Sequence, residues 1–117
     1  MLSAGPAVKV SIYLNADTGA EKAFLYQDLL SLLQLHGIDG ASVFKLHAGF
    51  GSHGRLHVDG AGSVNGEHLP ILICVIDTEE KIAGLMPALL AAVTDGLVEA
   101  HPTQILRVVQ GSSRVIV

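Results

Sequence analysis

The chain has 117 residues, a length that suits a single domain with one core. Half of the residues are hydrophobic, 15% are charged, and the formal net charge of -4 argues against nucleic acid as the main partner. A small domain this apolar carries more hydrophobic surface than its own core can bury, so we expect contacts between subunits.

The location of the protein is suggested by what the sequence lacks. No apolar run approaches the roughly 20 residues of a membrane-spanning helix, and the N-terminus lacks the basic start and apolar segment of a signal peptide. The single cysteine, Cys74, cannot form an internal disulfide, and its aliphatic neighbours predict a small core residue. We therefore expect a cytoplasmic protein without membrane insertion.

The first part of the chain predicts a strand and a helix. Residues 1–6 are expected to form a flexible N-terminal arm, and apolar residues then alternate over residues 8–14, as in a strand with one buried face. Thr18 suits the start of a helix, and leucines follow it at helical spacing. His36 and Gly37 are typical of the helix end.

The middle of the chain predicts two strands separated by a long loop. Residues 41–47 predict the second strand. Residues 48–68 are rich in glycine and histidine, and so long a connection in a small domain is usually functional or mobile. Residues 70–76 are an unbroken apolar run, which is typical of a central strand.

The last part predicts a second helix and a final strand. Asp77 and Glu80 have the spacing of an N-terminal cap, which we favour over an acid–base pair. Apolar residues then repeat at helical spacing, and Gly96 is expected to end the helix. Residues 104–110 predict the fourth strand, and residues 114–117 a short fifth.

The order of these elements predicts the α+β class. Two strand–helix–strand units form a ferredoxin-like fold, a four-stranded antiparallel sheet with two helices on one face. We expect one such domain over residues 7–117. The strand at residues 70–76 is apolar on both faces although helices cover only one, so the open faces of several subunits are expected to pack together.

Residues 40–51 are the candidate functional segment. They begin as a strand and end in Gly49-Phe50-Gly51 at the mouth of the long loop. Glycines allow bare backbone amides to approach a ligand and permit positive φ. A tight turn with the phenylalanine ring in the core would use the same residues, so both interpretations stay open.

Five short segments carry a further signal, namely residues 40–43, 49–51, 69–71, 75–82 and 85–89. Together, and in this order, they resemble the domain-of-unknown-function family 190, which is grouped with the PII-like proteins. The resemblance implies a ferredoxin-like homotrimer with clefts between its subunits. In the related PII proteins these clefts hold adenine nucleotides, and the loop after the second strand, the T-loop, contacts a target protein.

The resemblance also suggests where a ligand would bind. The end of the PII second strand corresponds to Gly49-Phe50-Gly51, and the basic residue before it corresponds to Lys45, which could otherwise be a solvated edge charge. Arg107 could reach an anion across a subunit boundary or be an ordinary surface charge. The candidate ligand-binding residues are Lys45, His47, Gly49, Phe50, Gly51, Ser52 and Arg107.

After this motif the chain departs from the PII pattern. PII proteins have arginine, glutamine and lysine where this chain has Ser52, His53 and Gly54, and residues 48–68 contain no tyrosine for uridylylation. Residues 94–99 contain no lysine, unlike the corresponding PII loop. We therefore expect no control by uridylylation, and a smaller or less charged effector such as a nucleoside monophosphate.

Histidines in the same region raise the alternative of a metal site. His47, His53, His57 and His68 lie in or beside the long loop, and neutral imidazoles are good metal ligands. They lack the cysteines and the fixed spacing of a tetrahedral zinc site. A divalent metal held by His53 and His57, in a cation-responsive trimer like the CutA proteins, is the alternative.

The sequence favours a regulatory function over catalysis. It contains no recognisable nucleophile elbow or catalytic carboxylate pair, so we expect no enzyme and no required cofactor. The favoured function is a trimer that binds an adenine nucleotide between subunits and uses residues 48–68 to engage a partner such as a membrane transporter. Besides the metal-binding trimer, a structural trimer that binds no effector is a further alternative.

Overall fold

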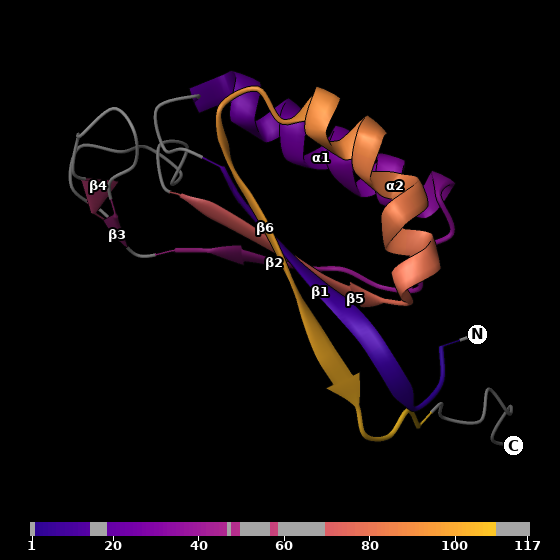
Figure 1. The fold of residues 1–117 in the computed structure, drawn as a ribbon. Helices are drawn as coiled ribbons and strands as arrows, with labels where there is room; N and C mark the ends of the chain where they lie inside the picture. The colour runs from indigo at the N-terminus through magenta and orange to yellow at the C-terminus, as the bar shows by residue number, and fades with distance from the viewer. Residues whose placement is uncertain (1, 15–18, 47, 50–56, 59–69, 110–117) are drawn as a thin grey trace, which may run out of the picture.

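The computed structural model describes residues 2–14, 19–46, 48–49, 57–58 and 70–109. Among these residues, the antiparallel main sheet has the strand order β2-β5-β1-β6, and helices α1 and α2 lie over the same face of it (Figure 1). This arrangement confirms the predicted α+β class and ferredoxin-like order. The elements are β1 (Gly5–Leu14), α1 (Gly19–Leu35), β2 (Ser42–Lys45), β3 (Ala48–Gly49), β4 (His57–Val58), β5 (Ile71–Asp77), α2 (Glu79–Ala92) and β6 (Gly96–Ile105).

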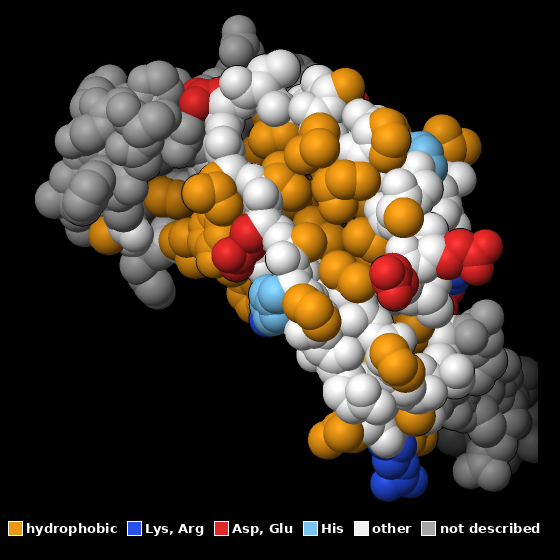
Figure 2. Space-filling view, in the orientation of Figure 1, with side chains coloured by type: hydrophobic (Ala, Val, Ile, Leu, Met, Phe, Trp, Pro, Cys, Tyr) orange, Lys and Arg blue, Asp and Glu red, His pale blue; other side chains and the backbone are white. Residues whose placement is uncertain are grey.

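The hydrophobic core lies between the sheet and the helices. Alternate residues of β1 and β5 turn toward α1 and α2, as the period of a strand requires, and Figure 2 shows hydrophobic side chains filling the space between β6 and the helices. Both helices contribute residues at helical spacing. The buried cluster consists of Val10, Ile12, Leu14, Leu29, Leu33, Ile38, Ile71, Ile73, Val75, Ile82, Leu85 and Leu89.

The other face of the sheet, which the helices leave open, is also apolar. Leu72, Cys74 and Ile76 alternate with the buried residues of β5 and are half-buried or exposed. Leu72 lies between Tyr13 of β1 and Phe44 of β2, which are 38% and 49% exposed. The prediction that this strand is apolar on both faces is therefore confirmed.

Helix α1 ends as the sequence predicts. The Nδ1 atom of His36 donates a hydrogen bond to the Leu32 carbonyl over 3.0 Å, and Gly37 has a φ of 76°, in the left-handed region that glycine adopts without strain. The chain then turns back toward the sheet, and the Ile38 N–H bonds to the Leu33 carbonyl over 3.1 Å. In the described part of the chain, the helices fall short of the length and hydrophobicity that crossing a membrane requires.

The start of α2 differs from the prediction by one residue. Its N-terminal cap is Thr78, whose hydroxyl accepts the Lys81 N–H over 3.3 Å, so the assignment of Asp77 as the cap is wrong. Asp77 is instead the last residue of β5, with a fully buried side chain. A carboxylate in that position can accept backbone hydrogen bonds from more than one segment.

The last strand lies earlier in the chain than the sequence predicts. β6 begins at Gly96, which the sequence pattern assigns to the end of the second helix. The strand predicted at residues 104–110 overlaps only the last two residues of β6, 104 and 105. Gly96 packs so closely against the Tyr13 carbonyl that no Cβ fits there. Pro102, a poor residue for a central strand, is tolerated because β6 is at the edge of the sheet.

The first strand is longer than the alternating pattern of residues 8–14. β1 begins at Gly5, because Gly5 and Pro6 pair with the end of β6. The expected arm of residues 1–6 thus overlaps the sheet. The predicted fifth strand at residues 114–117 lies outside the described residues.

Replacing Gly84 by alanine is expected to stabilise the protein. Gly84 lies inside α2, and apart from its chain neighbours and the surrounding helix backbone no described atom lies within 4 Å of the position that its Cβ would take. Glycine inside a helix costs about 0.5–1 kcal/mol relative to alanine. The free energy of unfolding from urea denaturation should rise by about that amount for Gly84→Ala, and a decrease would contradict the open surroundings of this residue.

Candidate functional site

A pocket of about 710 Å³ opens where β2 separates from β5. The chain entering β2, residues 39–42, forms one wall, and the end of β5, residues 74–76, forms another. Leu2 and the pair Val108 and Val109 complete the lining, so both terminal segments of the described chain reach the pocket. Asp39 is the charged member of these lining residues, and the rest are apolar or small.

The hydrogen-bond ladder between β2 and β5 stops at this pocket. In antiparallel strands, every second pair of opposite residues exchanges hydrogen bonds. The Leu46 N–H donates to the Pro70 carbonyl over 2.9 Å, so the bonded pairs of β2 and β5 are this pair and every second pair from it. The strand pairing ends with Ser42 and Cys74, although Gly40 and Ile76 would be the next pair to exchange hydrogen bonds. These two residues therefore exchange no ladder bond, and their backbones border the pocket.

A smaller hollow of about 290 Å³ lies on the α1 side of the same connection. It is lined by Leu30, Leu33 and Gln34 of α1 and by Ile38. It shares residues 39–41 with the larger pocket. Residues 39–41 therefore form a wall between the two hollows. The position of this wall depends on the contacts that hold its two ends.

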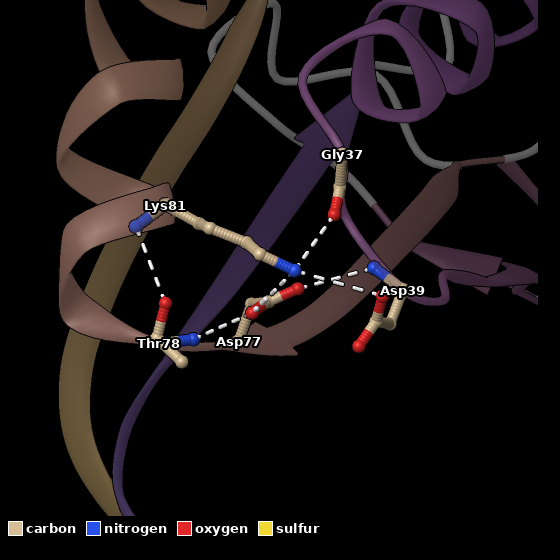
Figure 3. A network of polar contacts seen from close by, with 5 residues as sticks. All are labelled: Gly37, Asp39, Asp77, Thr78 and Lys81. Atoms are coloured by element: carbon tan, nitrogen blue, oxygen red, sulfur yellow. Dashed lines mark hydrogen bonds and ion pairs between the residues drawn. The ribbon is translucent and has the colours of Figure 1, made fainter. Parts of the chain in front are cut away.

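A polar network fixes the start of this wall (Figure 3). The fully buried carboxylate of Asp77 accepts the Asp39 N–H at Oδ2 over 3.1 Å and the Thr78 N–H at Oδ1 over 2.7 Å. Lys81 donates from Nζ to the Gly37 carbonyl over 2.9 Å and lies 3.6 Å from a carboxylate oxygen of both Asp77 and Asp39. Such partners offset the cost of burying a charge. The network joins the α1–β2 connection to the start of α2.

The sequence-predicted residues that the structure describes do not line this pocket. Lys45 is the exposed last residue of β2, at the opposite end from the pocket, and Arg107 is exposed just after β6. Gly49 and His57 are brought together, since they pair in the short β3–β4 ladder. Five of the predicted residues lie outside the described part of the chain, namely His47, Phe50, Gly51, Ser52 and His53.

The ligand and metal roles of these residues therefore stay predictions. Within the described residues, no group of three or more histidine, cysteine or acidic side chains is placed to hold a metal ion. His53 lies outside that range, and for His57 the structure describes only the backbone. The proposed metal pair thus awaits a binding measurement.

Sequence reasoning misses the pocket although it selects the segment that borders it. The glycines at the end of the segment 40–51 make it a candidate, whereas the pocket lies at its beginning, around Gly40 and Ser42. Cys74 lines the pocket and is half-buried, with its Sγ 4.0 Å from the Ser11 hydroxyl. A signal was available in Asp77, because a carboxylate that ends an apolar central strand needs partners from another segment.

Comparison with known proteins identifies the family. The model of the family DUF190, described as Uncharacterized ACR, matches residues 7–105. The chain belongs to the DUF190 family. It is also similar to the UPF0166 protein MJ1524 of Methanocaldococcus jannaschii, with 35% identity over 81 residues that cover 68% of this chain and 72% of the relative.

Solved structures place this DUF190 chain among the PII-like proteins. It is similar to CPII of Thiomonas intermedia K12, a nitrogen regulatory PII-like protein bound to ADP, AMP and bicarbonate, with 27% identity, a TM-score of 0.63 and coverage of 92% of this chain and 94% of CPII. A PII-like signalling protein of Thermus thermophilus has 20% identity, a TM-score of 0.56 and coverage of 90% and 91%, which shows the shared fold. The resemblance seen in the sequence is confirmed.

Proposed function

We propose that this DUF190 protein is a cytoplasmic regulator that binds an adenine nucleotide and is not an enzyme. The observation that carries the proposal is the interrupted β2–β5 ladder beside a pocket of about 710 Å³. A pocket with apolar walls and a few placed polar groups is the usual form of a small-molecule site. The similarity to CPII, which was solved with ADP and AMP, supports a nucleotide as the occupant.

The chemistry of the lining suits a nucleobase. A base is planar, with apolar faces and a hydrogen-bonding edge. Val108, Val109 and Ile76 offer apolar contacts to such faces, and the backbone of Gly40 and Ile76 is released from the ladder at the pocket wall. Backbone amides and carbonyls can then bond the edge of a base in the way that another strand would bond them.

The same lining favours a ligand with few phosphates. Among the lining residues that the structure describes, the charged side chain is the acidic Asp39, which pairs with Lys81 and offers a phosphate no positive charge. The described cation closest in sequence to the lining is Arg107, which precedes Val108 and is exposed. A monophosphate needs less cationic compensation than a triphosphate, so we expect AMP to bind at least as well as ATP.

The assembly that we propose is a homotrimer with the nucleotide between subunits. The open sheet face supports self-association, since Tyr13, Phe44, Ile76 and Leu97 are each 38–54% exposed there. In the trimer, residues 48–68 would contact a partner such as a membrane transporter, with the bound nucleotide shifting the balance between loop states. A pull-down with the loop deleted as control would identify that partner.

Calorimetric titration with AMP, ADP and ATP tests the proposal. We expect saturable binding of AMP and ADP to the wild-type protein, and a loss of about tenfold or more for Ser42→Phe, whose ring would occupy the pocket. The matched control is Gln104→Phe, another exposed strand position that does not line the pocket. No heat from any of the three nucleotides, with the assembled protein verified by sedimentation, would contradict the proposal.

A further inference from the structure

We infer that Asp77 and Lys81 are positioning residues that hold the nucleotide pocket open. The inference rests on the proposed function, because it assigns a role in binding to side chains outside the pocket lining. It concerns the wall formed by residues 39–41, which separates the two hollows and carries the Gly40 backbone. What holds this wall determines whether its backbone groups stay available to a ligand.

The wall is tied to β5 at both ends. At one end Ser42 pairs with Cys74 in the ladder. At the other end the Asp39 N–H is bonded to the Asp77 carboxylate over 3.1 Å, so a side chain takes the place of strand pairing. Gly40 lies between these two ties, opposite Ile76, and it is there that the ladder bond is absent.

The two ties together set the width of the gap between Gly40 and Ile76. Ser42 and Asp39 are each held against β5, and the segment between them spans the gap as a short bridge. Loss of either tie would let the bridge move, either away from β5 or into the ladder with it. In both cases the backbone groups at Gly40 and Ile76 would leave the arrangement that a nucleobase needs.

Lys81 strengthens the Asp77 tie from the side. Its ammonium group bonds the Gly37 carbonyl over 2.9 Å and pairs with the Asp77 and Asp39 carboxylates at 3.6 Å. The pair with Asp39 is partly exposed, with side-chain exposures of 34% and 39%, and such pairs contribute little by themselves. The pair with the fully buried Asp77 matters more. The Asp39 and Thr78 amides bond to the Asp77 carboxylate, and the positive charge of Lys81 offsets the cost of burying that carboxylate in its charged form.

Thr78 offers a matched control for a purely structural role. Its hydroxyl caps α2, and its own N–H uses the second oxygen of Asp77. Thr78→Ala removes the cap hydroxyl and weakens the start of the helix, but it leaves the bond between Asp39 and Asp77 in place. Asp77→Asn leaves one acceptor oxygen for two backbone donors and removes the charge that pairs with Lys81, so the tie to the Asp39 N–H is weakened or lost in either orientation of the amide.

The experiment combines AMP titration with amide hydrogen exchange on the full chain. We expect Asp77→Asn to weaken AMP binding by about tenfold and to speed exchange of the amides of residues 39–42, because the Asp77 side chain that holds the Asp39 N–H against β5 becomes a weaker acceptor or is lost as one. Thr78→Ala should keep AMP affinity within about twofold of the wild type, since its effect is on the helix cap. Equal effects of the two variants on AMP affinity would overturn the inference.

Lys81 provides a second route in case Asp77→Asn does not fold. Lys81→Met keeps the apolar stem and removes the charge, so we expect weaker AMP binding, and Lys81→Arg should restore it because a guanidinium can bond the same oxygens. Wild-type AMP affinity in Lys81→Met would count against the positioning role. If the wild-type protein binds none of the nucleotides, the proposed function fails. Amide hydrogen exchange of residues 39–42 in the unliganded variants still decides whether the polar network holds the wall.

Discussion

Replacing Leu89 by alanine is expected to lower the free energy of unfolding by about 2–5 kcal/mol. Leu89 is fully buried and belongs to the cluster that joins α2 to the sheet. Truncation removes apolar contact area and leaves a cavity, because the surrounding strands and α1 cannot collapse fully into the space. Urea denaturation followed by far-UV circular dichroism measures the loss.

The neighbouring residue, Leu90, is the matched control for this prediction. It has the same side chain in the same helix but is 56% exposed. Leu90→Ala should change the free energy of unfolding by no more than about 0.5 kcal/mol. Equal losses at the two positions would contradict the orientation of α2, or would mean that subunits cover its outer face.

Replacing Gly96 by alanine is expected to cost about 1–3 kcal/mol of stability. A Cβ at this position would collide with the carbonyl of Tyr13, which belongs to the backbone of β1 and cannot rotate away as a side chain would. The strain would reach the start of β6, because Gly96 pairs with Leu14 at the end of β1. The expected result is a lower midpoint in urea with an unchanged slope.

Gly84→Ala is the natural control for Gly96→Ala. The same chemical change is made at both positions, but Gly84 has open space around it and is expected to gain stability. Opposite signs for the two variants would confirm that close backbone contact, and not helix or strand propensity, decides the outcome at Gly96. A stable Gly96→Ala protein would show that β1 and β6 can separate locally without cost.

Much of the fold could be predicted because it depends on local patterns. The buried face of β1, the stripe of α2 and the end of α1 shortly before Gly37 follow from residue spacing and from the conformations that each residue allows. The last strand could not be predicted in this way. Gly96 and Pro102 are signs of a loop by propensity, and it is the long pairing with β1 at the sheet edge that makes them part of a strand.

The candidate site was less predictable than the fold. The sequence directs attention to the end of the segment 40–51, where Gly49 and its neighbours lie, because glycines next to a long loop can be recognised from the sequence alone. The pocket at its beginning depends on Ser42, Cys74 and Ile76 meeting across two strands, with the terminal segments beside them. No local pattern records that the ladder stops there.

The sequence by itself determined the class of fold, the family and the apolar nature of both faces of β5, because these follow from composition, order and period. Tertiary structure decided where β6 runs and why Asp77 is buried. Asp77 has the sequence position of an ordinary helix cap, yet its carboxylate is bonded to Asp39, which is distant in the chain. A buried charge takes its partners from whatever backbone packs against it, and only the folded chain brings that backbone near.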